Sequence, residues 1–129
     1  MWIYVQDSGK LYHKDDVTDT TMLVAFGYSG ADWGKDNPAA EAEHNIGPIP
    51  VGLFTIEPPR DTIHSPFTLP LTPYPANEMF GRSGFLIHGD KIGAPGTASQ
   101  GCIILPRDTR NMIWGSGDHD LQVVHTFQV

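Results

Sequence analysis

The chain of 129 residues has little of three things: cysteine, positive charge and long apolar runs. Its single cysteine, Cys102, excludes an internal disulfide and any metal site built from several cysteines. Eight Lys and Arg stand against fifteen Asp and Glu, and this net charge of −7 argues against nucleic acid as a partner, because nucleic acid binds basic surfaces. No stretch approaches the roughly 20 apolar residues of a spanning helix, so no membrane insertion is expected.

The N-terminus also lacks the basic segment, apolar run and small-residue cleavage site of a signal peptide. If the protein works outside the cytoplasm, another route is expected to carry it there, unless the chain has been trimmed of its own leader. What the sequence does have is proline and glycine, eleven and fourteen residues respectively. This composition favours short strands joined by turns. The length fits one domain over residues 1–129.

The hydrophobic pattern predicts a mainly β fold, a compact and mostly antiparallel sandwich or barrel with one or two short helices. A cap residue followed by proline indicates a short helix over 37–43, and a second helix is expected over 106–114. The crowded prolines between 58 and 75 predict an irregular excursion with one edge strand. The expected strands are a hairpin over 2–13, then 21–26, 51–56, 67–71 (the edge strand), 84–88, 102–105 and 121–129.

Two residues in the stretch from Gly84 to Leu105 point to nucleophilic catalysis. His88 ends one apolar strand and Cys102 begins the next, and strands that follow one another in sequence are usually neighbours in space. An imidazole beside a thiol favours a thiolate–imidazolium pair, which is a strong nucleophile. The Gly89 carbonyl would accept the other imidazole N–H, and the N–H groups of Gly101 and Cys102 would face an oxyanion.

The alternative reading is that Cys102 is inert core and His88 an ordinary surface residue, which holds for most isolated Cys and His residues. The combination of strand, His-Gly, glycine-rich loop, Ser-x-Gly-Cys and apolar strand favours catalysis over that reading. The other five histidines have no metal-ligand spacing and are assigned to surface or turn roles: His13, His44, His64, His119 and His125. Asp90 fits either a turn or a group that tunes His88. No metal and no cofactor are expected.

The string His88-Gly89, followed by Ser99-Gln100-Gly101-Cys102-Ile103, resembles the signature of L,D-transpeptidases (the YkuD-type catalytic domain). The segment from Gly47 to Ile56, GPIPVGLFTI, resembles a second strand motif of that family. A compact subgroup that includes antibacterial effectors of type VI secretion systems is closer still. It shares an opening like that of Trp2 to Leu11, a segment like Met79 to Gly84, and the ending Ile-Leu-Pro, so that the resemblance covers nearly the whole chain.

The resemblance implies a catalytic domain that acts on peptidoglycan stem peptides in the bacterial periplasm or cell wall. Cys102 would form a thioester with the residue before a terminal D-amino acid, with His88 as its proton acceptor. Water would complete an L,D-carboxypeptidase reaction, and an amine would complete transpeptidation. An effector of this kind would reach target cells through a secretion apparatus and would have a cognate immunity protein in the producing cell.

Two positions depart from the wider family. Gln100 stands where many members have a histidine, and Ile104 stands where many have Arg or Asn, which removes a cationic contact for a substrate carboxylate. Arg82 is the expected replacement, although a role as a mere surface cation is as plausible; Arg107 and Arg110 are weaker candidates. Ser99 and Gln100 are expected with Arg82 to bind the substrate.

Two other functions are weighed against this one. A sortase-like transpeptidase also places His before Cys on a β scaffold, but it would want an arginine on a strand after the cysteine. A non-catalytic module that binds the cell wall or a partner protein could keep the same fold. In that case the Cys102 thiol would be unreactive in the native state.

Overall fold

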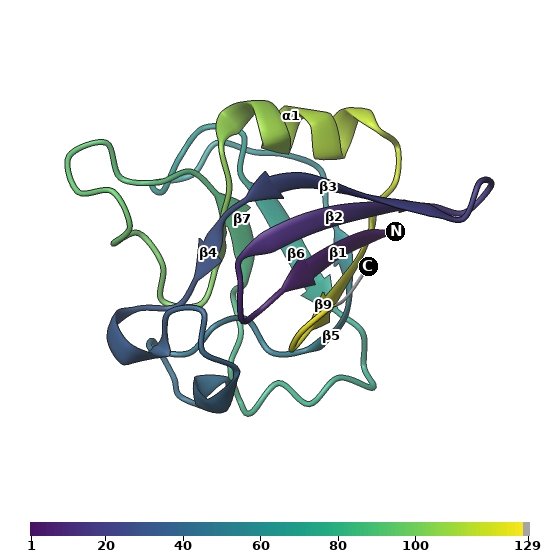
Figure 1. The fold of residues 1–129 in the computed structure, drawn as a ribbon. Helices are drawn as coiled ribbons and strands as arrows, with labels where there is room; N and C mark the ends of the chain where they lie inside the picture. Colours follow the sequence, from purple (N-terminus) through teal and green to yellow (C-terminus); the bar gives the residue numbers. More distant parts are fainter. Residues whose placement is uncertain (128–129) are drawn as a thin grey trace.

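The computed structural model describes residues 1–127, and the fold is mainly β, as the sequence predicts. Across those residues nine strands form one continuous, nearly closed barrel-like sheet in the order β3-β2-β1-β9-β5-β6-β7-β8-β4 (Figure 1). Six of the eight strand pairings are antiparallel, and the two parallel ones join β1 to β9 and β7 to β8. The strands are β1 (Trp2–Val5), β2 (Lys10–Asp15), β3 (Thr20–Phe26), β4 (Tyr28–Ser29), β5 (Gly52–Ile56), β6 (Leu69–Pro73), β7 (Leu86–His88), β8 (Ile103–Ile104) and β9 (Asp120–Val124).

Both predicted helical segments are present, the first in shorter form and the second shifted by one residue. The first is a 3-10 turn, η2 (Pro38–Ala40), whose Asn37 side chain accepts the Ala39 N–H, and another 3-10 turn, η1 (Asp32–Gly34), precedes it. The second is the helix α1 (Arg107–Gly115), which lies across the top of the sheet in Figure 1. In residues 1–127 no helix has the length and apolar character needed to cross a bilayer.

The strand predictions were wrong in two respects. β6 is not an edge strand, because its Leu71–Pro73 half pairs with β5 and its Leu69–Pro70 half pairs with β7. Each of its prolines therefore has a paired strand on one side only, which an interior strand tolerates. The last strand ends at Val124 rather than Val129, and residues 128–129 of that prediction lie outside the described residues.

The core lies inside the curved sheet and is closed by α1. It holds Trp2, Tyr4, Leu11, Phe54, Leu69, Ile87, Ile103, Ile113 and Leu121, each at most 2 % exposed. Full burial of side chains of this size stabilises the fold by about 1.5–3 kcal/mol each. Ile87 of β7 and Ile103 of β8 both belong to this core, so the two strands present one face to the interior and the other to the site described below.

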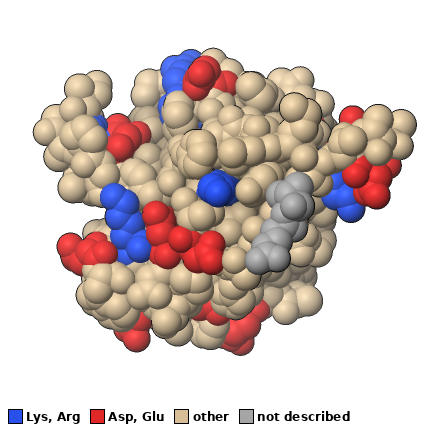
Figure 2. Space-filling view, in the orientation of Figure 1, with Lys and Arg blue, Asp and Glu red and all other residues tan. Residues whose placement is uncertain are grey.

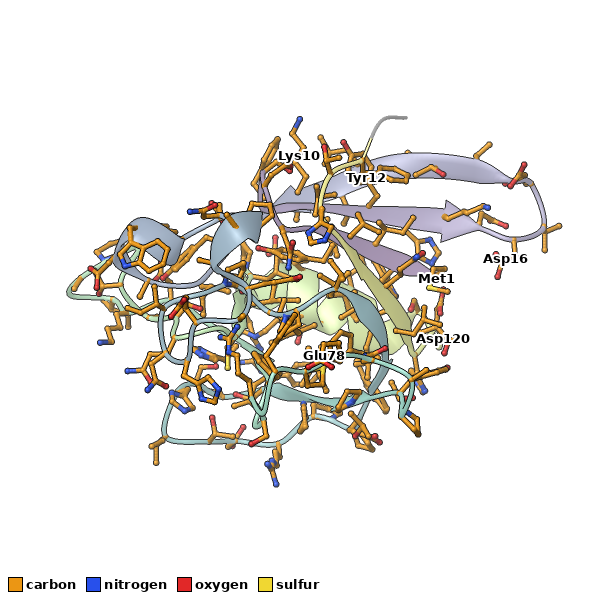
Figure 3. All side chains as sticks on the ribbon, turned by 90° about the horizontal axis from the view of Figure 1, so that it is seen from below. Met1, Lys10, Tyr12, Asp16, Glu78 and Asp120 are labelled. Atoms are coloured by element: carbon orange, nitrogen blue, oxygen red, sulfur yellow. The ribbon has the colours of Figure 1, made fainter. Side chains whose placement is uncertain are left out.

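The hairpin of β2 and β3 extends beyond the rest of the sheet. Figure 3 shows Asp16 at its tip, away from the body of the molecule. Val17, in the turn at the tip, is 94 % exposed, since this end of the ribbon has little to pack against. Met22 and Phe26, further along β3, are 68 % and 64 % exposed. On the face shown in Figure 2, Lys and Arg are interspersed with Asp and Glu on a mostly uncharged surface.

Candidate active site

His88 and Cys102 line the same cavity, which has a volume of about 560 Å³. They reach it from neighbouring parallel strands, with Ile87 beside Ile103 and His88 beside Ile104 in the register. Because Ile87 and Ile103 face the core, His88, the next residue of β7, and Cys102, the residue just before β8, face the other way. His88 and Cys102 thus lie diagonally across one face, two register positions apart, with their Cα atoms about 8 Å from one another.

The pairing of these strands was predicted, but their parallel direction was not. Residues 89–101 form the crossover that a parallel pair requires, and in Figure 1 this loop stands out from the left of the barrel. His88 is therefore at the far end of its strand from Cys102, so the two residues lie on a diagonal of the sheet rather than side by side at one end. The geometry depends on both strands being very short, two and three residues.

The imidazole of His88 is buried and has a defined tautomer. Its Nδ1 lies 2.8 Å from the Gly89 carbonyl oxygen, and a carbonyl can only accept, so Nδ1 carries the proton. This leaves Nε2 as the basic nitrogen. The ring is 2 % exposed, and burial lowers the pKa of His88, which the Gly89 carbonyl offsets in part. At neutral pH the imidazole is accordingly uncharged.

The Cys102 thiol is half-buried and opens on the cavity, so it is not sealed in the core. Its Sγ lies 3.9 Å from the Gly84 carbonyl oxygen. Burial raises the pKa of Cys102, while the backbone N–H of Leu86 and the charge of Arg82 lower it by less. The directions of the two shifts favour a neutral thiol and a neutral imidazole at rest. Both directions run against the expected thiolate–imidazolium pair, and the pH dependence of alkylation given below decides between the two forms.

Ser99 organises the turn before the nucleophile. Its hydroxyl is 2 % exposed, accepts the N–H groups of Gly101 at 3.0 Å and Gly30 at 2.8 Å, and donates to the Cys102 carbonyl at 2.6 Å. The Gly101 N–H is thus already paired, and the expectation that it faces an oxyanion was wrong. The Ser99 hydroxyl is likewise fully engaged in these three backbone hydrogen bonds, so its role is to hold the turn and not to contact the substrate. Gln100 is exposed and lines the cavity.

Gly101 is required for a steric reason instead. Its φ of +140° is a conformation that side chains disfavour, and a Cβ there would lie 2.5 Å from Nη2 of Arg82 and 2.9 Å from the Phe85 ring. The Ser29 hydroxyl, at the edge strand β4, donates to the Gly101 carbonyl at 2.8 Å and accepts the Ile49 N–H at 2.9 Å. Sequence analysis missed Ser29, whose only signal was its place in a glycine-rich segment.

Arg82 is a buried strut and not a surface cation. It is 7 % exposed, and its guanidinium donates to four backbone carbonyls: Glu41 (2.6 Å), Pro48 (2.7 Å), Gly47 (2.9 Å) and Gln100 (3.2 Å). These bonds use all four hydrogens of its two Nη atoms. Arg82 borders the cavity and contributes charge to it. Its Nη hydrogens are bonded to backbone carbonyls of the cavity wall, so they are not free to bind a substrate carboxylate.

The two weaker candidates, Arg107 and Arg110, do not serve the site either. Arg110 of α1 is 3 % exposed and donates to the carbonyls of Leu105, Pro66 and Phe67, which fastens the segment between β5 and β6 to the helix. Arg107 is exposed and lies over the Phe67 ring at 5.1 Å. Neither lines the cavity that contains Cys102.

The crossover loop is anchored by Asp90, which therefore has the turn role considered above. Asp90 accepts the Tyr28 hydroxyl at 2.6 Å and the Gly96 N–H at 3.0 Å, and the same hydroxyl accepts the Ala98 N–H at 2.9 Å. Burial and this bond to Asp90 raise the pKa of Tyr28 to about 12. Asp90 also favours a protonated His88, but this effect is smaller than those of burial and of the Gly89 carbonyl.

Replacing Arg82 tests its structural role. In Arg82→Gln the carbonyls of Glu41, Gly47, Pro48 and Gln100 lose most of their donors, and we expect the free energy of unfolding to fall by about 3 kcal/mol or more. Arg107→Gln is the matched control, since an exposed cation over a ring contributes under about 1 kcal/mol. Urea denaturation measures both. Equal free energies of unfolding for the two variants would contradict the structural role of Arg82.

The pH dependence of alkylation tests the neutral resting pair. Thiolate is the reactive form, and the raised pKa of Cys102 predicts that the rate with iodoacetamide climbs through a midpoint above the ordinary thiol value of about 8.5. N-acetylcysteine in the same buffers provides the reference titration, and the chain has no other cysteine to react. A plateau of fast alkylation between pH 5 and 7 would indicate an ion pair instead.

The comparisons with known proteins give one match. The model of the Tlde1 domain matches residues 24–127, which include both His88 and Cys102. No curated protein and no solved structure matches the chain. The match covers well over half of the sequence and agrees with the effector subgroup that the motifs resemble. The chain belongs to the Tlde1 domain family, a family of type VI secretion effectors.

Proposed function

We propose that the protein is an antibacterial effector that cleaves or exchanges the terminal D-amino acid of peptidoglycan stem tetrapeptides, with Cys102 as nucleophile and His88 as base. The observation that carries this is the shared cavity, in which a half-buried thiol and an imidazole of defined tautomer lie on one face of adjacent strands. The membership of an effector family supports the antibacterial role. It also supports delivery into target cells and a cognate immunity protein in the producer.

The charge of the cavity supports a substrate that carries carboxylates. Among the described residues that line it, Arg82 and Lys91 carry positive charge and none is Asp or Glu. This contrasts with a chain that has almost twice as many acidic as basic residues. A stem peptide ends in a free carboxylate, so a lining without acidic side chains is complementary to it.

The reaction follows from the neutral pair. Nε2 of His88 takes the thiol proton as Sγ attacks the carbonyl carbon of the residue before the terminal D-amino acid. The tetrahedral intermediate collapses, the C–N bond breaks, and the leaving amine takes the proton from His88. Water or an amine then attacks the thioester, passing a proton through His88 to the departing sulfur. Water gives a carboxypeptidase product, and a D-amino acid or a second stem gives an exchanged or cross-linked one.

The Cys102 N–H is the donor that we assign to the oxyanion, because the Gly101 N–H is paired with Ser99. One such donor typically contributes about 3 kcal/mol to lowering the barrier. The sortase-like alternative is disfavoured by the positions of Arg107 and Arg110 in α1, because it would need an arginine on a strand beside the cysteine.

Purified muropeptides with tetrapeptide stems test the proposal. We expect the wild type to release D-alanine, and Cys102→Ala to be slower by about 10³-fold or more because the nucleophile is gone. Mass spectrometry with and without an added D-amino acid separates hydrolysis from exchange. His119→Ala, outside the cavity, is the control. Equal release by wild type and Cys102→Ala would remove Cys102 as the nucleophile, and no release by the wild type would favour the binding module.

The pH profile of the same reaction tests the role of His88. Activity needs the neutral imidazole and is lost as the pH falls through its pKa. Burial lowers that pKa, so the acid limb of kcat/KM should lie below the ordinary imidazole value of about 6.5. Rates of D-alanine release between pH 4 and 8 measure it. An acid limb well above 6.5 would show that a different group is the base.

A further inference from the structure

His64 lies against the imidazole of His88. The two ring centroids are 4.7 Å apart and the ring planes differ by 21°, which is a stacked arrangement. His64 comes from the irregular segment between β5 and β6, is exposed, and lines the same cavity as Cys102. Sequence analysis had assigned it to the surface, because nothing near it in the sequence relates it to His88.

The backbone around His64 is held in a tight turn by the side-chain hydroxyl groups of neighbouring Thr and Ser residues. The Thr62 hydroxyl accepts the His64 N–H at 3.1 Å, and the Thr62 N–H donates to the Ser65 carbonyl at 3.0 Å. The hydroxyl of Thr68 lies 3.0 Å from that of Thr62 and 3.2 Å from that of Ser65. The position of the His64 ring is therefore set by the turn and not by polar contacts of the ring.

This turn is fastened to the residue that follows His88. The Ser65 hydroxyl accepts the Gly89 N–H at 2.9 Å. Arg110 holds the next two carbonyls, those of Pro66 at 3.2 Å and Phe67 at 3.1 Å. The Ser65 hydroxyl thus ties the two histidine-bearing segments together directly, although 24 positions separate His64 from His88 in the sequence. Arg110 adds an indirect tie, because it also donates to the carbonyl of Leu105, whose own N–H donates to the His88 carbonyl at 3.1 Å.

We propose that His64 is a positioning residue for His88: its ring covers one face of the imidazole and, with the Gly89 carbonyl on Nδ1, keeps Nε2 turned to the cavity. A buried histidine held at one nitrogen can still rotate or tilt about that contact, and a flat ring stacked on its face restricts this motion. The proposal rests on the proposed function only in taking His88 as the base.

The stack also couples the charges of the two rings. His88 is influenced by burial and by four groups around it: the Gly89 carbonyl, His64, Arg110 and Asp90. Protonated His64 and Arg110 oppose a second positive charge on His88, whereas Asp90 and the carbonyl favour it. Neutral His64 therefore permits the imidazolium that forms when Cys102 attacks, and protonated His64 resists it.

Two substitutions separate stacking from charge. His64→Ala removes both, and we expect kcat for D-alanine release to fall about 10-fold with KM within twofold, because the base is misplaced and substrate binding is not the main loss. His64→Phe keeps a flat ring and should recover most of kcat. The matched control is His119→Ala, which removes a histidine stacked on Trp114 at 4.1 Å, outside the cavity. A kcat for His64→Ala within twofold of the wild type overturns the proposal.

A titration followed by NMR needs no substrate and separates this proposal from the proposed function. The imidazole resonance of His88, assigned by its loss in His88→Gln, should titrate at a higher pH in His64→Phe than in the wild type, because a phenyl ring cannot place a positive charge beside it. His119→Ala should leave it unmoved. If His88 titrates at the same pH in His64→Phe as in the wild type, the coupling is overturned. A wild type that releases no D-alanine would overturn the proposed function, while this titration would still decide whether His64 acts on His88.

Discussion

The guanidinium of Arg82 is the interaction on which the site depends. Its four bonds to backbone carbonyls reach the segment after η2 and the turn before Cys102. A buried cation can be held this way because carbonyl dipoles replace the water it has lost. Without it, the Gly47–Pro48 segment and the Gln100 turn would lose the cation that they share. The Ser29 hydroxyl, which joins Ile49 to Gly101, would be left to hold this cavity wall with two hydrogen bonds.

The local parts of the fold could be predicted from the sequence. The first hairpin, β5 and α1 each have their own signals: an apolar run and a turn for the hairpin, and flanking prolines and glycines for β5 and α1. The direction of β8 and the interior place of β6 could not be predicted, because both depend on partners far away in the chain. A single residue pattern is compatible with either strand direction, and proline normally marks an edge.

The same distinction applies to the site. His88 and Cys102 stood out because their spacing and neighbours form a motif, and the structure brings them to one cavity. Arg82 was noticed as a charge, but its hydrogen-bond partners are carbonyls, which every residue has and no sequence pattern reveals. His64 and Ser29 act through contacts between distant segments and were missed. The burial that raises the pKa of Cys102 and lowers that of His88, and so favours the uncharged form of each, is also a property of the folded chain alone.

The sheet closes on itself through one short stretch of chain. β3 forms one border of the sheet and β4 the other, and only Gly27 separates them, so a single run of residues from Thr20 to Ser29 supplies both borders. β4 is also the outer neighbour of β8, the strand that follows the nucleophile. The two borders of the barrel therefore meet at Gly27, which we call the seam. If the β2–β3 hairpin loses its pairing there, β4 is displaced and with it β8, the strand that follows Cys102. We expect the seam and the structure around Cys102 to unfold together as one cooperative unit, so that a partly opened molecule has no intact site.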